Sequence, residues 1–166
     1  MKTRNETGLK IRIKTCIWII IIGLAISGLT AFPLESELKW LVQQRWMHLN
    51  FLFDWLLVIY RAIKTTNQSF PFLSYGTDWL AFAHLMIAVL FIGPLKDPVK
   101  NIWVIEFGMI ACISIFPLAL IAGPIRQIPF FWRLIDCSFG FVGIIPLAIC
   151  RKHIKSLEFI NTLKSK

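Results

Sequence analysis

A chain of 166 residues in which 57% are hydrophobic and only 16% are charged, with a mean hydropathy of +0.68, has too little polar surface to cover a soluble globule. This balance excludes a soluble enzyme, and the lack of a glycine-rich phosphate loop excludes a nucleotide-driven pump. The net charge of +9 would suggest nucleic acid in a soluble protein, but here the basic residues gather beside apolar stretches, where they meet anionic lipid head groups. We therefore expect an all-α, polytopic membrane protein with membrane lipids, and no nucleic acid, as partners.

Four apolar stretches are long enough to cross a hydrocarbon core of roughly 30 Å, which takes about 20 helical residues. The first follows a basic leader and also fits a secretory signal peptide, but we expect an uncleaved anchor. Pro117 and Pro146 should kink the last two, because proline removes a backbone donor and crowds the preceding turn. The sequence therefore predicts one integral membrane domain, 1–166, with transmembrane helices at about 16–33, 78–95, 102–123 and 131–150.

Lysine and arginine are unevenly shared between the segments that connect these stretches. Five lie in the leader, two in the link 96–101 and five in the tail from Arg151, so twelve of the eighteen fall on one side if both ends share that side. The positive-inside rule then predicts that both termini are cytoplasmic and that the number of crossings is even. We expect the cell inner membrane as the location.

The segment between the first two stretches differs from the others, because polar residues interrupt it. Gln43, Asn50, Asp54 and Arg61 recur at spacings of seven, four and seven, which favours an amphipathic helix or helix pair over 34–64 that lies along the outer leaflet. Two alternatives stay open: residues 46–63 cross the membrane, or they form a re-entrant hairpin. The polar run 65–69 before Pro71 is predicted to be an exposed loop.

Ionisable residues inside the apolar stretches are costly and are therefore candidates for function. His84, Arg126, Arg133 and Asp136 are all predicted near the outer boundary, where they would line a ligand-binding pocket for an anionic head group. The simpler interpretation is that Arg133 and Asp136, three residues apart, neutralise each other, and that His84 forms an interhelical hydrogen bond. Glu106 is a proton-relay candidate, although pairing with Lys96 or Lys100 is the favoured interpretation.

Cysteine and glycine have structural interpretations. The four cysteines form no C-x-x-C pair and have no histidine at metal spacing, so we expect buried thiols, no metal site and no cofactor. Gly23 with Ser27, Gly108 with Cys112, and the nearby Gly140 and Gly143 would allow helices to approach closely.

The sequence indicates where the protein lies more directly than what it does. The layout is similar to that of the quinone-linked disulfide-generating membrane proteins, but their paired cysteines have no match here, so the resemblance implies no activity and no site residues. Two functions stay open. The favoured one is a non-catalytic subunit or scaffold that packs against other membrane proteins or further copies of this chain. The other is an enzyme or carrier that handles a lipid or a small molecule at the outer face.

Overall fold

The computed structural model describes the backbone of residues 2–164 and, within the first helix, side chains from Glu6 onward. Lys2, Arg4 and Lys166, which the charge count includes, have side chains outside that range. Helices and turns make up the described backbone, and no strand occurs between residues 2 and 164. The chain divides into two compact units, 1–22 with 88–166 and 23–87, so that α1 (Lys2–Ala31) and α4 (Tyr75–Leu90) contribute to both. Each unit is described by itself.

Four helices have the length and apolar composition needed to cross a membrane, as the sequence predicts. They cover Glu6–Ala31, Pro71–Lys96, Ile102–Ile125 and Phe130–Lys164. In each, only 22% of the most apolar window is buried by the chain itself. The rest of each apolar face is open to lipid or to other proteins, which suggests a multi-pass membrane protein.

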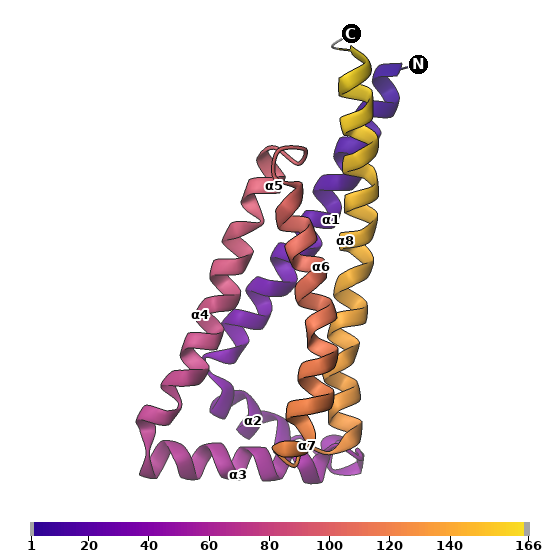
Figure 1. Cartoon of the computed structure of the whole chain (residues 1–166). Coiled ribbons are helices and arrows are strands. Elements are labelled where there is room, and N and C mark those ends of the chain that lie inside the picture. The colour runs from indigo at the N-terminus through magenta and orange to yellow at the C-terminus, as the bar shows by residue number, and fades with distance from the viewer. Residues whose placement is uncertain (1, 165–166) are drawn as a thin grey trace. The chain divides into compact units, whose positions relative to one another are not determined.

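The larger unit is built around a pair of helices. α6 (Ile102–Pro117) and α8 (Phe130–Lys164) run side by side in opposite directions, joined by the π-helical turn η3 (Leu118–Ala122) and by α7 (Gly123–Ile125) (Figure 1). η3 directly follows Pro117, consistent with the backbone donor that proline lacks. Pro146, in contrast, lies inside a continuous α8. The short α5 (Ile92–Lys96) precedes α6.

The core of this unit is formed by one face of α8 and by buried side chains from α1, from α6 and from the segment before α5. Leu147, Cys150, Ile154 and Leu157 of α8 follow a three-four-three spacing, which places them on one helix face, and all are at most 2% exposed. They are joined by other buried side chains, which are Ile13, Ile17, Phe91, Val104 and Ile105. The leader end of α1 therefore packs with the tail end of α8, and the two chain ends lie together in Figure 1.

Glycines set the separation of the paired helices. A Cβ on Gly140 would lie 2.7 Å from the carbonyl oxygen of Cys112, and one on Gly143 would lie 2.9 Å from the Cys112 sulfur. At Gly108, Phe91 and Leu147 fill the space that a side chain would need. These contacts confirm the close approach expected from the small residues of α6 and α8.

The smaller unit combines the end of α1, from residue 23, with α2 (Leu34–Val42), η1 (Met47–Leu49), α3 (Phe53–Ser69), η2 (Pro71–Leu73) and α4 up to residue 87. Gly28 lets α1 approach α4, since its Cβ would lie 2.8 Å from the Ala81 carbonyl oxygen. α2 packs on α3, and Figure 1 shows α3 running crosswise to α4. The predicted stripe is divided between elements, because the chain turns between Gln43 and Asn50.

The expected loop at 65–69 is wrong, because α3 continues to Ser69. Asn67 explains the difference: its amide nitrogen donates to Glu35 Oε2 at 2.6 Å, and its amide oxygen accepts a hydrogen bond from the Ser74 hydroxyl. The side chain of Asn67 therefore connects α3 to Glu35 of α2 and to Ser74, instead of forming a local turn. The helix ends before Pro71, which disfavours helical geometry at Phe70.

Candidate functional site

The four predicted ligand-binding residues are divided between the two units. His84 lies in the smaller unit, whereas Arg126, Arg133 and Asp136 lie in the larger one. His84 Nδ1 is 2.8 Å from the Leu80 carbonyl oxygen, and because a carbonyl only accepts, Nδ1 must carry the proton. In the neutral ring this leaves Nε2 as an acceptor, and it has no hydrogen-bond partner within its unit.

Arg133 is held by apolar contacts. Its side chain crosses Gly123, where an added Cβ would lie 2.4 Å from Arg133 Cδ, and its guanidinium carbon lies 5.2 Å from the centroid of the Phe130 ring. Arg133 Nε is buried and has no hydrogen-bond partner among the residues that the structure describes. Glycine at position 123 is therefore needed to leave room for this arginine.

The ion pair that the spacing of Arg133 and Asp136 permits does not form. Asp136 is half-buried, and within residues 2–164 its carboxylate has neither a hydrogen bond nor an ion-pair partner. Arg126 is exposed at the end of α7, beside Gln127 with its left-handed φ of 57°. The structure thus places all three near the start of α8 without joining them through polar contacts.

Glu106 is paired, but with a residue that the sequence did not indicate. Its Oε1 accepts from Arg151 Nε at 2.9 Å, and the two side chains are 42% and 46% exposed. The partner comes from α8 and not from Lys96 or Lys100, because the antiparallel pairing of α6 and α8 sets Glu106 beside the end of the apolar stretch of α8. Only the apposition of the two helices could have predicted this pair.

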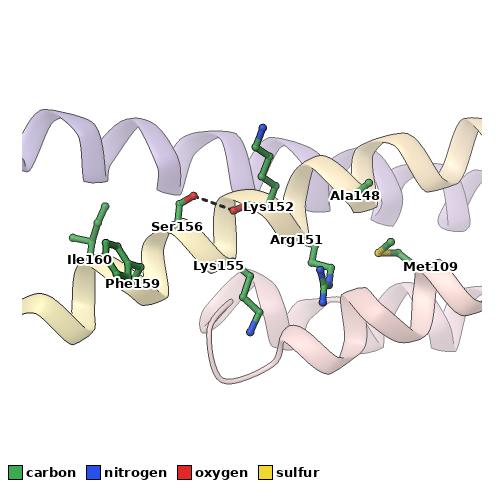
Figure 2. Close-up of a pocket in the computed structure, with 8 residues that line it drawn as sticks. All are labelled: Met109, Ala148, Arg151, Lys152, Lys155, Ser156, Phe159 and Ile160. Atoms are coloured by element: carbon green, nitrogen blue, oxygen red, sulfur yellow. Dashed lines mark hydrogen bonds between the residues drawn. The ribbon is translucent and has the colours of Figure 1, made fainter.

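A shallow cleft of about 700 Å³ lies along α6 and α8. Figure 2 shows Arg151 and Lys155 on the α6 side of α8, whereas Lys152 points away on the opposite side. Arg151 forms an ion pair with Glu106, and Lys155 Nζ lies 3.0 Å from Glu158 Oε2. The cations on the α6 side of this cleft are therefore already compensated by carboxylates.

A second cleft, of about 500 Å³, lies between α1, α5 and α8. Three lysines and one carboxylate line it, which are Lys10, Lys14, Lys96 and Asp97. The apolar part of the lining includes Ile13, Pro94 and Leu157, all of which are buried. The remaining lining residues are Leu95, Pro98, Val99 and Asn161. Charge and apolar surface thus meet in one cavity.

Acidic partners are distributed unevenly around this second cleft. Glu6 pairs with Lys10 at 3.1 Å and also with Lys164, whereas Lys14 and Lys96 have no ion-pair partner within residues 2–164. Hydrogen bonds from Lys164 and Lys10 lower the pKa of Glu6, which lies well before the apolar stretch of α1. Beyond the apolar stretch of α8, burial and the charges of Arg12 and Lys152 lower the pKa of His153. Positive charge therefore dominates this end of the unit.

Potential metal ligands and thiols are spread through the described residues. No group of three or more histidine, cysteine, aspartate or glutamate side chains comes together there as metal ligands would. All four cysteines are free thiols, and Cys137 and Cys150 are buried. Buried thiols of this kind pack as small apolar groups.

No protein-family model matches the chain, and neither a curated protein nor a solved structure matches it.

Proposed function

We propose that the chain crosses the inner membrane four times with both termini in the cytoplasm, and that it acts as a non-catalytic subunit of a larger membrane assembly. Four apolar helices support the crossings. The ion pair between Glu6 and Lys164 supports an even number, because it holds the two ends of the chain on one side. The excess of lysine and arginine in the terminal segments favours the cytoplasm as that side.

The amphipathic segment lies along the outer leaflet in this proposal. Its longest helix, α3, has 17 residues, is not among the four candidate spans and runs crosswise to α4. Asp54 and Arg61 are seven residues apart, about two helical turns, which aligns them on one side of α3 where they can meet the head groups.

The observation that carries the proposal of a larger assembly is the carboxylate of Asp136 near the start of α8. Asp136 is half-buried, within the apolar stretch 131–150, and has no partner among the described residues. In hydrocarbon, a polar group without a partner costs several kcal/mol. A polar side chain of a neighbouring subunit removes this cost, which is how transmembrane helices are commonly joined.

Native mass spectrometry of the protein, purified from its own host in a mild detergent, tests the assembly. We expect complexes heavier than the 19.2 kDa chain, and their loss in Asp136→Leu. Glu158→Gln removes a carboxylate from the tail of α8 and should leave the complexes intact. A monomer for the unmodified protein in every mild detergent, or equal assembly of Asp136→Leu and the unmodified chain, contradicts the proposal.

Cysteine labelling of intact cells tests the topology. In a chain stripped of its own cysteines, Lys39→Cys should react with a membrane-impermeant maleimide from outside, and Lys164→Cys should react only after lysis. Labelling of Lys164→Cys in intact cells would show that the tail is external and would remove the basis for an even number of crossings.

A second function is favoured by one observation, the buried Nε of Arg133, which has no hydrogen-bond partner in the described part of the chain. A lipid or small anionic molecule bound near Arg126, Arg133 and Asp136 of the larger unit, at the outer face, would satisfy it. A molecule that stays bound through delipidation, is lost from Arg133→Met and is retained by Lys14→Gln would support this function. Delipidated protein without any bound molecule would contradict it.

A further inference from the structure

We propose that the cleft between α1, α5 and α8 binds the phosphate of an anionic phospholipid, with Lys14 and Lys96 as its ligands. This inference requires that the chain span a membrane, but it is independent of any assembly with other subunits. It concerns the end of the larger unit that holds both chain termini, and none of its residues belongs to the candidate pocket around Arg133.

Three segments far apart in the sequence build the cleft. Lys10, Ile13 and Lys14 come from α1, residues 94–99 come from α5 and the turn after it, and Leu157 and Asn161 come from α8. Helix packing thus brings Lys14 and Lys96 to one cavity, although they are separated by most of the first half of the chain.

The charge balance favours an anion. Lys10 is engaged by Glu6 at 3.1 Å, which leaves Lys14 and Lys96 uncompensated among the described residues. The one carboxylate in the lining, that of Asp97, accepts a hydrogen bond from the backbone nitrogen of Lys100 at 3.1 Å. Two free ammonium groups against one carboxylate leave a net positive cavity, which is the arrangement that binds lipid head groups between transmembrane helices.

The position of the cleft favours a lipid over a soluble anion. Lys96 directly follows the apolar stretch 78–95, and Lys14 comes just before the apolar stretch of α1 that begins at Cys16. Both are therefore at the level where phosphate groups lie in a bilayer. Leu95 and Val99, which are half-buried in the same lining, add accessible apolar surface beside the lysines, which suits the glycerol and ester region of a phospholipid and gives a free phosphate nothing to contact.

Binding can be measured on the full chain in detergent by native mass spectrometry with added phosphatidylglycerol. Removing one lysine near a lipid phosphate weakens binding about fivefold, so Lys14→Gln/Lys96→Gln should weaken it about 25-fold. Lys39→Gln/Lys64→Gln removes the same charge from the other unit and should change binding less than twofold. An equal loss in the two double variants would overturn the site, because it would show general attraction to a basic protein.

Asp97→Asn is a variant in which lipid binding should become stronger, so misfolding of the variant cannot produce the expected result. The asparagine oxygen can still accept the Lys100 hydrogen bond, while the charge that repels phosphate is removed. We expect phosphatidylglycerol to bind up to about fivefold tighter. Unchanged or weaker binding would overturn the proposal.

Two further probes identify the source of the phosphate. Phosphatidylcholine, whose phosphate is balanced by choline, should bind at least tenfold more weakly than phosphatidylglycerol, and inorganic phosphate should not displace the lipid. Equal binding of the two lipids would refute recognition of net charge. Displacement by inorganic phosphate would refute the lipid and identify a soluble anion site.

Discussion

Gly140→Ala tests whether the spacing of α6 and α8 depends on a single missing methyl group. The new Cβ would lie 2.7 Å from the Cys112 carbonyl oxygen, whereas ordinary contacts begin at 3.4 Å, so the helices must separate by about 0.7 Å. Since the obstacle is backbone, no side-chain rotation relieves it. Overpacking of this kind costs about 1–3 kcal/mol. The same substitution gains about 1 kcal/mol of helix propensity, which would hide part of the cost.

Gly23→Ala is the matched control, because Gly23 is also in an apolar helix and a Cβ there has nothing within 4 Å. The propensity gain is common to both variants, so their difference isolates the packing cost. In SDS titrations followed by tryptophan fluorescence, we expect the free energy of unfolding of Gly140→Ala to be about 1–3 kcal/mol below that of Gly23→Ala. Equal stability would refute the close approach of α6 and α8.

Gly143→Ala extends the same argument to a side-chain obstacle. Its Cβ would meet the Cys112 sulfur at 2.9 Å, and that sulfur can rotate or be removed. Cys112→Ala should therefore relieve Gly143→Ala but leave Gly140→Ala destabilised, since the carbonyl oxygen stays in place. Relief of both variants by Cys112→Ala would place the obstacle at Gly140 on the sulfur and contradict the geometry.

Three other contacts give separate predictions. A double-mutant cycle of Glu106→Gln and Arg151→Gln should give a coupling energy of about 0.2–1 kcal/mol in the same titration, because both side chains are well exposed, and a value of several kcal/mol would contradict a surface pair. Asn67→Ala should lower the free energy of unfolding by about 1–2 kcal/mol through the lost contacts with Glu35 and Ser74, whereas the exposed Thr65→Ala should not, and equal effects would refute the bridge. The pKa of Glu6 is lowered by Lys164 and Lys10, so the contact of the chain ends is complete above the ordinary glutamate pKa and is lost as the pH falls through the lowered one. Spin labels on Gly8→Cys and Leu163→Cys should therefore move apart when the pH is lowered from neutral through the lowered Glu6 pKa, and in Glu6→Gln they should already be apart at neutral pH. A distance independent of pH would contradict the ion pair.

The apolar stretches could be predicted because lipid demands about 20 consecutive apolar residues, a requirement that composition alone reveals. The ends of the helices could not. The predicted spans 131–150 and 16–33 mark only the apolar stretches, whereas α8 continues to Lys164 and α1 begins already at Lys2. Outside the apolar stretches, Ile13 of α1 and Ile154 and Leu157 of α8 are buried. Tertiary packing therefore extends both helices where hydropathy gives no signal.

The segment 34–69 shows a different limit. A helix or a helix pair was predicted there, and the structure has two helices, α2 and α3, with η1 between them, so the four polar residues do not follow one helix axis. The run 65–69 looked like a loop because threonine, asparagine and serine favour turns when their side chains bond to the local backbone. Here Asn67 bonds to Glu35, 32 residues away, and that long-range partner is invisible in a local pattern.

Charges in the larger unit show why a count of lysines cannot locate a binding site. The sequence places the leader, the link after α5 and the tail on one side, and in this arrangement every lysine there looks equivalent. The fold distinguishes the basic residues by their ion pairs. Glu6 pairs with Lys10 and Lys164, and Glu106 of α6 pairs with Arg151 of α8. Among the described residues Lys14 and Lys96 form no ion pair, and both line one cavity, which also holds the Asp97 carboxylate. The proposed lipid site is thus formed by lysines that have no ion-pair partner among the described residues. It depends on contacts between distant segments, which a local sequence pattern does not contain.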